Sequence, residues 1–179
     1  MRKKALLATG LLTIGSLPLG GCPQAIRIPV EFALPASLGA FTVQAGVPIQ
    51  NDNILTVGDS SLSPSNGTLR IDPSNIIIAG AQGGGKVAIQ QQGGTLTISA
   101  KIAASEDLAT VCETGEEYGP FSVELDSSNQ PVSVDPSSVV LSDNAIDLIN
   151  VGEFALCIEI VSPIDGTVTI TALNFSFGL

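Results

Sequence analysis

The chain has 179 residues, of which 44% are hydrophobic and 13% charged, a composition that excludes an intrinsically disordered protein. Its formal net charge is −10 and it contains no histidine, so the usual general base and the commonest transition-metal ligand are both missing. Three of the seven basic residues lie within the first four positions, which leaves 4 − 17 = −13 for the remainder. Four scattered cations exclude a nucleic-acid-binding protein, because such proteins cluster Lys and Arg against phosphates.

The amino-terminal segment has the layout of a secretory signal. Arg2, Lys3 and Lys4 precede an apolar stretch over residues 5–19 that three Gly and Pro residues interrupt. Such a stretch is too short for a comfortable membrane span, and its charged start is typical of a signal peptide. We therefore expect residues 1–21 to be removed during export.

The end of this leader reads Leu19-Gly20-Gly21-Cys22. It resembles the lipobox of bacterial lipoproteins, in which an aliphatic residue and two small residues precede a cysteine. The resemblance covers residues 1–22 only, and it implies diacylglycerol attachment to Cys22, cleavage before it and fatty acylation, typically with palmitate, of the new amino terminus. The alternative is an ordinary signal peptide whose cleavage site falls near a cysteine.

The resemblance also predicts a location and a partner. Each buried methylene of an acyl chain contributes about 0.8 kcal/mol, so the membrane would hold the protein through acylated Cys22. We expect a bacterial cell-envelope protein. Pro23 stands where an Asp would signal inner-membrane retention, which favours the outer membrane if the cell has two. Residues 22–25 would then form a very short tether, followed by a single domain over residues 26–179.

Short runs of alternating apolar residues, separated by Gly, Pro, Asn and Asp, predict β-strands throughout this domain. Residues 26–32 alternate, and Pro29 places that strand at a sheet edge. Residues 75–79 are apolar on both faces, which predicts a strand buried in the middle of a sheet. Residues 95–102 put Leu96, Ile98, Ala100 and Ile102 on one face.

The carboxy-terminal third adds a helix candidate and a change of phase. Residues 143–151 fit either a short helix or an irregular connection. Apolar residues occupy even positions from Val168 to Ala172 and odd positions from Leu173 onward. A one-residue slip swaps the two faces of a strand, so we expect a bulge or a crossing between sheets here. The sequence predicts an all-β fold, an antiparallel two-sheet β-sandwich with residues 143–151 as the one candidate for a short helix.

With Cys22 occupied by lipid, Cys112 and Cys157 remain as an even pair in an oxidising compartment. We expect a disulfide between them, with two free buried thiols as the alternative. The alternation over residues 154–160 puts Cys157 on the face opposite Phe154. Residues 113–118 read as a solvated loop beside Cys112.

Three further patterns resemble a phosphate-binding, a calcium-binding and a catalytic site, but each lacks features that such a site needs. Residues 80–86 spell a phosphate-loop pattern, but Val87 follows where Ser or Thr is needed, so a glycine hairpin is the better interpretation. Residues 51–53, Asp59 and Asp72 offer oxygen ligands for calcium without EF-hand spacing. Five carboxylates could serve a glycosidase, but one Tyr and no Trp give little platform for sugars. These five are Glu113, Glu116, Glu117, Glu153 and Glu159.

From the sequence we expect no catalytic residue, no cofactor and no metal site. The favoured hypothesis is a non-catalytic structural or protein-interaction module, anchored by lipid, that contacts another envelope protein. The alternative is a lipid-anchored module that binds a glycan or calcium through loops at one end of the sandwich.

Overall fold

A computed structural model describes residues 27–57, 64–80, 93–135 and 138–178. The described chain is mostly strand, arranged in antiparallel sheets of five, four and three strands, which confirms the all-β, sandwich-like fold. The elements in chain order are β1 (Arg27–Ala33), α1 (Ala36–Gly39), β2 (Ala40–Val43), β3 (Pro48–Thr56), β4 (Asn66–Arg70), η1 (Pro73–Asn75), β5 (Ile76–Gly80), β6 (Gly94–Ala104), η2 (Ser105–Thr110), α2 (Val111–Thr114), β7 (Glu116–Leu125), β8 (Pro131–Asp135), β9 (Val139–Val140), α3 (Asp143–Val151), β10 (Glu153–Val161), β11 (Gly166–Ile170) and β12 (Ala172–Gly178).

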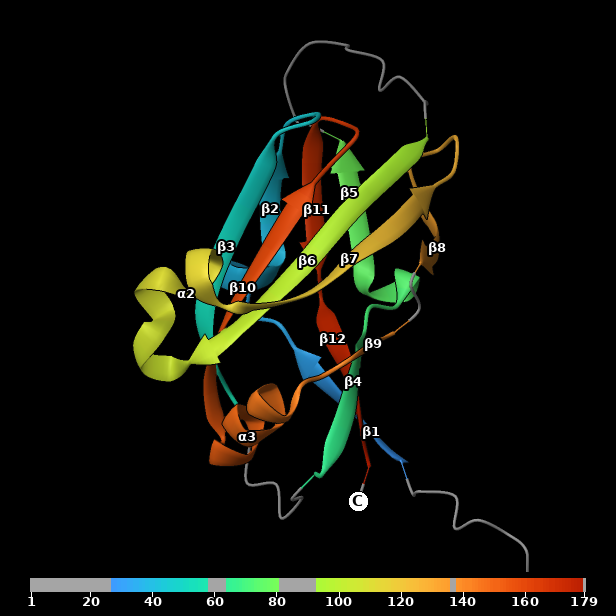
Figure 1. Cartoon of the computed structure of the whole chain (residues 1–179). Helices are drawn as coiled ribbons and strands as arrows, with labels where there is room; N and C mark the ends of the chain where they lie inside the picture. Colours follow the sequence, from blue (N-terminus) through green and yellow to red (C-terminus); the bar gives the residue numbers. More distant parts are fainter. Residues whose placement is uncertain (1–26, 58–63, 81–92, 136–137, 179) are drawn as a thin grey trace, which may run out of the picture.

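The five-stranded sheet, in the order β3-β10-β6-β7-β8, forms one layer, here called the front sheet. Figure 1 shows it crossing in front of β2, β11 and β5. Its strands follow the period-2 pattern, and the predicted inward row of β6, from Leu96 to Ile102, is at most 1% exposed. Alternate side chains therefore face the core, and the intervening ones form an outer surface, here called the front face.

The second layer, here called the back layer, is divided into two sheets that are linked end to end. β12 belongs to the sheet ordered β1-β12-β4-β9, and β11 belongs to the sheet ordered β2-β11-β5. Only Thr171 separates β11 from β12, and it is exposed while Ile170 and Leu173 are buried. The predicted change of phase near residue 172 is confirmed, because the chain crosses from one sheet to the next at this point.

Both layers contribute to one main hydrophobic core. Phe175 of β12 lies at its aromatic centre, with its ring 4.9 Å from that of Phe32 at an interplanar angle of 86° and 5.8 Å from that of Phe177. The edge-to-face arrangement matches the preferred geometry of aromatic pairs. The odd-numbered residues at the end of the chain are therefore core residues, as far as Phe177.

Of the two interpretations of residues 143–151, the short helix is the correct one, and it forms α3 (Figure 1). The Ser142 side chain accepts a hydrogen bond from the backbone N–H of Ala145, and Gly152 ends the helix with a φ of 93°, a conformation that glycine adopts freely. α3 contacts β4, β6 and β10, so it fills the space between the front sheet and the four-stranded sheet. Gly67 permits this approach, since a Cβ there would lie 2.9 Å from Ile146 and Phe177 atoms.

Two expectations about local structure are wrong. β5 is an edge strand of its sheet, not a strand buried in the middle, and Ile77 is 56% exposed. Residues 113–118 are not one loop, because α2 ends at Thr114 and β7 begins at Glu116. In contrast, Pro29 does lie in an edge strand, since β12 is the one described strand with which β1 pairs.

Within the described part of the chain, no helix combines the length and apolar character needed to cross a membrane.

Candidate functional site

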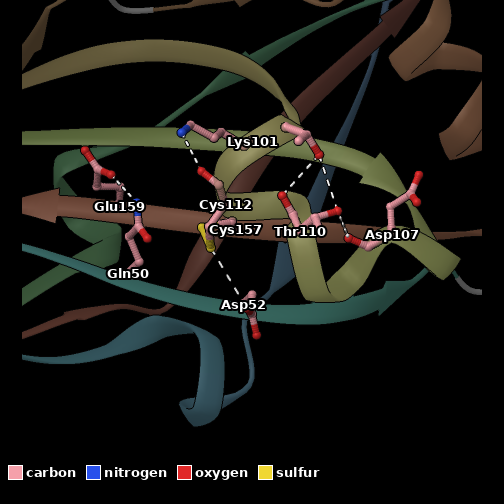
Figure 2. The surroundings of a disulfide bond; sticks show 9 residues. Gln50, Asp52, Lys101, Asp107, Thr110, Cys112, Cys157 and Glu159 are labelled. Carbon is pink, nitrogen blue, oxygen red and sulfur yellow. Dashed lines mark hydrogen bonds between the residues drawn. A yellow bond between two sulfur atoms is a disulfide. The ribbon is translucent and has the colours of Figure 1, made fainter.

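The expected pairing of Cys112 with Cys157 is confirmed as a disulfide that links α2 to β10 (Figure 2). The S–S distance is 2.12 Å, the two Cα atoms are 5.2 Å apart, and 45 residues separate the cysteines in sequence. Cys157 occupies the middle of β10 on the front face, opposite the core side, as the alternation predicts. The bond therefore fixes a short helix to the outside of the front sheet.

A small second hydrophobic cluster surrounds this bond. Val111, Ala155 and Cys157 are at most 1% exposed, and the partly buried side chains of Ala103, Leu108 and Cys112 pack on them. η2 and α2 contribute three of these six residues and the front sheet the other three. Because η2 and α2 cover Ala155 and Cys157, part of the front face is buried instead of facing solvent.

Polar groups flank the disulfide on both sides. Lys101 Nζ donates a hydrogen bond to the backbone carbonyl oxygen of Cys112 over 2.6 Å (Figure 2). Asp52 Oδ2 lies 3.9 Å from Cys112 Sγ, a contact only, because a disulfide sulfur carries no proton to donate. Along the same face, Gln50 donates to the carboxylate of Glu159.

The strand register brings unlike groups into one row across the front face. Cys157 stands opposite Asp52 on one side and Lys101 on the other, and Lys101 stands opposite Glu117. Opposite charges in neighbouring strands attract one another, so Lys101 offsets the repulsion between the acidic groups around it. This row joins four strands around the disulfide.

The two outer surfaces of the sandwich differ in charge. Counted over the described residues, the front face carries one cation, Lys101, against six carboxylates, giving 1 − 6 = −5. Its acidic residues are Asp52, Glu117, Glu124, Asp135, Glu153 and Glu159. η2 and α2, which lie on that side, add Glu106, Asp107 and Glu113.

The outer surface of the four-stranded sheet is close to neutral. It carries Arg27 and Arg70 against Glu31, which gives 2 − 1 = +1. Asp72 lies at its rim, where Arg70 forms an ion pair with it at 2.6 Å. The described charge of the domain is therefore distributed very unevenly between its two layers.

The residues proposed for calcium are separated in the structure and hold other partners. The Asn51 and Asn53 side chains donate to Ala40 O and Ser37 Oγ, respectively, and so connect β3 to β2 and α1. Asp72 caps η1: hydrogen bonds from the Ser74 side chain and backbone, followed by Arg70, hold its pKa below the usual value. Asp59 and the glycine-rich residues 81–86 lie outside the described residues, as does Cys22.

The five candidate carboxylates are likewise not assembled into a site. Glu113, Glu117 and Glu153 are exposed and Glu159 is half-buried, while Glu116 accepts a hydrogen bond from Ser142. Among the described residues, no group of three or more His, Cys, Asp or Glu side chains is placed to hold a metal ion.

One polar network was missed by the sequence reasoning. Ser142 Oγ donates to Glu116 Oε2 over 2.7 Å and lies 3.0 Å from Tyr118 Oη, while it also caps α3. Burial raises the pKa of Tyr118, and the hydrogen bond with Ser142 opposes that rise. A Ser directly before a helical run is an N-cap signal and was available in the sequence, but the distant partners Glu116 and Tyr118 were not.

A small apolar pocket lies between α3, the four-stranded sheet and the segment after β3. Val30, Phe32, Val57, Pro64, Ile149, Asn150 and Phe177 line it. Its volume of about 20 Å³ is space for about one water, whereas ligand pockets measure about 300–1,000 Å³. This pocket is therefore a packing irregularity and not a binding site.

No protein-family model, curated protein or solved structure matches the chain. Among the described residues, a disulfide fixes η2 and α2 to the outside of an acidic sheet face.

Proposed function

We propose that this protein is a lipid-anchored module of the bacterial cell envelope that acts by binding another envelope protein. The observation that carries the proposal is the sequence Leu19-Gly20-Gly21-Cys22, which ends an exported-type leader five residues before β1 begins. An acylated Cys22 would place the sandwich directly at a bilayer. The complete lack of histidine in the chain favours a binding role over acid–base catalysis.

The acidic front face supports a binding role and suggests the chemistry of the partner. Its strands pair in one five-stranded sheet, and the disulfide fixes α2 to that sheet. Complementary potentials steer association and raise its rate, so a basic surface on the partner fits this face. Binding by such a face weakens as salt increases.

Cross-linking in intact cells, followed by identification of the captured protein, tests this proposal. The test variant is Glu117→Gln/Glu124→Gln/Asp135→Asn, which removes three front-face charges without changing side-chain size. Glu31→Gln on the back layer is the matched control. We expect one reproducible partner that the control captures and the triple variant captures poorly. Equal capture by both variants would show that the front face is not the binding surface.

The alternative, a module that binds a glycan or calcium, makes a different prediction. A ligand that binds only the folded state raises its melting temperature by mass action. A specific glycan, or calcium itself, that raises the melting temperature of the purified protein in proportion to its concentration would favour this alternative over a protein partner.

A further inference from the structure

Building on the proposed lipid anchor, we infer that the outer surface of the four-stranded sheet lies against the lipid surface and that the acidic front face turns away from it. This surface, here called the membrane face, is made of the outward residues of β1, β12, β4 and β9. It includes Arg27, Pro29 and Glu31 of β1, Asn174 and Ser176 of β12, Thr68 and Arg70 of β4, and Val140 of β9.

The length of the tether decides which end of the domain is near the bilayer. Five residue steps separate Cys22 from Arg27, and an extended chain covers at most about 3.6 Å per residue, so Cys22 lies within about 18 Å of Arg27. The path from Gly166 to Gly178 through β11 and β12 measures about 40 Å, at about 3.3 Å per residue. A tether of this length cannot reach from one end of the domain to the other.

The strand register identifies the anchored end. Arg27 stands opposite Gly178, and Gly178 stands opposite Asn66, so β1 begins where β12 ends and β4 starts. In Figure 1, β1 and the end of β12 lie in the lower part of the molecule, at the same end as α3. Because β1 is an edge strand of the back layer, the anchor also attaches to that layer and not to the front sheet.

Charge then decides which face turns towards the lipid. Bacterial envelope lipids are often anionic, and an anionic surface repels the front face, whose described charge is 1 − 6 = −5. The membrane face is neutral once Asp72, the ion-pair partner of Arg70, is counted with Glu31 (2 − 2 = 0), so the lipid does not repel it. The two layers of a sandwich pack about 10 Å apart, which is about one Debye length at 0.1 M salt. With the back layer towards the membrane, the front-face carboxylates lie about one Debye length further from the lipid, where salt screens most of the electrostatic repulsion.

The composition of the membrane face agrees with this orientation. Arg27 and Arg70, two of the three cations in the described residues, lie on it, and the Arg70 side chain, which is paired with Asp72, is 52% exposed. Val140, at 73% exposed, is among the most exposed large apolar side chains of the described chain. Arginine and small apolar side chains are compatible with a headgroup layer, and Glu31 is the one carboxylate among the outward residues of these four strands.

Site-specific fluorescence quenching tests the orientation on the full protein purified from bacterial membranes. The variants Val140→Cys, on the membrane face, and Glu153→Cys, on the front face at the same end of the domain, are each labelled with a thiol-reactive fluorophore. Cys112 and Cys157 do not compete for the label, because they form the disulfide. Each labelled protein is reconstituted into anionic vesicles of phosphatidylglycerol and phosphatidylethanolamine that contain lipids with nitroxide headgroups.

We expect quenching at position 140 to be several-fold greater than at position 153. Equal quenching, or stronger quenching at position 153, would overturn the orientation and leave the anchor intact. The intact mass of the same samples reports acylation of Cys22. A mass without acyl groups would refute the anchor, and this inference with it.

Discussion

Lys101 Nζ donates a hydrogen bond of 2.6 Å to the backbone carbonyl oxygen of Cys112, and Lys101 stands directly opposite Cys157 in the β6–β10 ladder. One side chain therefore bridges the helix and the sheet that the disulfide joins. The hydrogen bond is charge-assisted, which makes it stronger than one between neutral groups. Together the two links hold η2 and α2 on a sheet face that would otherwise be exposed.

Removing the disulfide should cost a large part of the stability of the domain. A cross-link that closes 45 residues is worth about 4 kcal/mol in the chain-entropy model. We expect Cys112→Ala/Cys157→Ala to lower the free energy of unfolding in urea by about this amount, and hydrogen exchange in η2 and α2 to accelerate most. A loss below about 1 kcal/mol would show that η2 and α2 remain on the sheet without the cross-link.

Two neighbouring isoleucines test the edge position of β5. Ile76 is 5% exposed and belongs to the core, whereas Ile77 is 56% exposed. We expect Ile76→Ala to cost about 2–5 kcal/mol and Ile77→Ala no more than about 0.5 kcal/mol in chemical unfolding. Similar large losses at both positions would instead support a strand buried on both faces.

The cap of α3 offers a third prediction. Ser142 accepts from Ala145 N and also joins Tyr118 and Glu116, so Ser142→Ala removes the cap and leaves the Tyr118 hydroxyl without this partner. We expect a loss of about 1–2 kcal/mol in the free energy of unfolding. Ser133→Ala, on the exposed face of β8, is the control and should change stability by less than about 0.5 kcal/mol. Equal effects of the two substitutions would contradict the role given to Ser142.

Acid should remove a stabilising contribution from the turn at Asp126. Hydrogen bonds from the Gln130 backbone N–H, and then from the Ser128 side chain and backbone N–H, hold the pKa of Asp126 below its ordinary value. A carboxyl whose pKa is depressed in the folded state stabilises that state above the unfolded pKa, and the benefit is lost as pH falls through the folded value.

Asp126→Asn keeps an oxygen acceptor but cannot ionise. We expect the wild type to exceed this variant in thermal stability at pH 7, and the difference in melting temperature to shrink as the pH falls below the ordinary value of 3.8. Melting curves of both proteins across this range provide the measurement. A difference that stays constant with pH would assign the effect of the substitution to shape and not to charge.

The sequence predicted those elements in which a local pattern of apolar and polar residues decides which side chains are buried. The inward row of β6, the helix after Ser142 and the crossing at Thr171 all follow from patterns within about ten residues. The pairing of Cys112 with Cys157 followed from the count of cysteines once Cys22 was assigned to lipid.

Features decided by distant partners were not predictable in this way. Residues 76–78 are three isoleucines, and their local sequence does not show which of them is buried. Among the described strands β5 pairs only with β11, and at this sheet edge Ile77 faces solvent. The sequence of η2 and α2 shows no clear helical period. A disulfide and a six-residue cluster hold these two short helices on the sheet, so they do not need a long apolar face. The division of the back layer likewise depends on the separate partners of β11 and β12.

The most direct test of the central claim is to replace Cys22 with Ala, supply labelled palmitate and fractionate the cells. We predict that the wild-type protein takes up label and sediments with membranes, whereas Cys22→Ala takes up none and appears in the soluble fraction or as unprocessed precursor. A wild-type protein without label, together with a Cys22→Ala protein that remains membrane-bound as a processed chain, would contradict the lipid anchor.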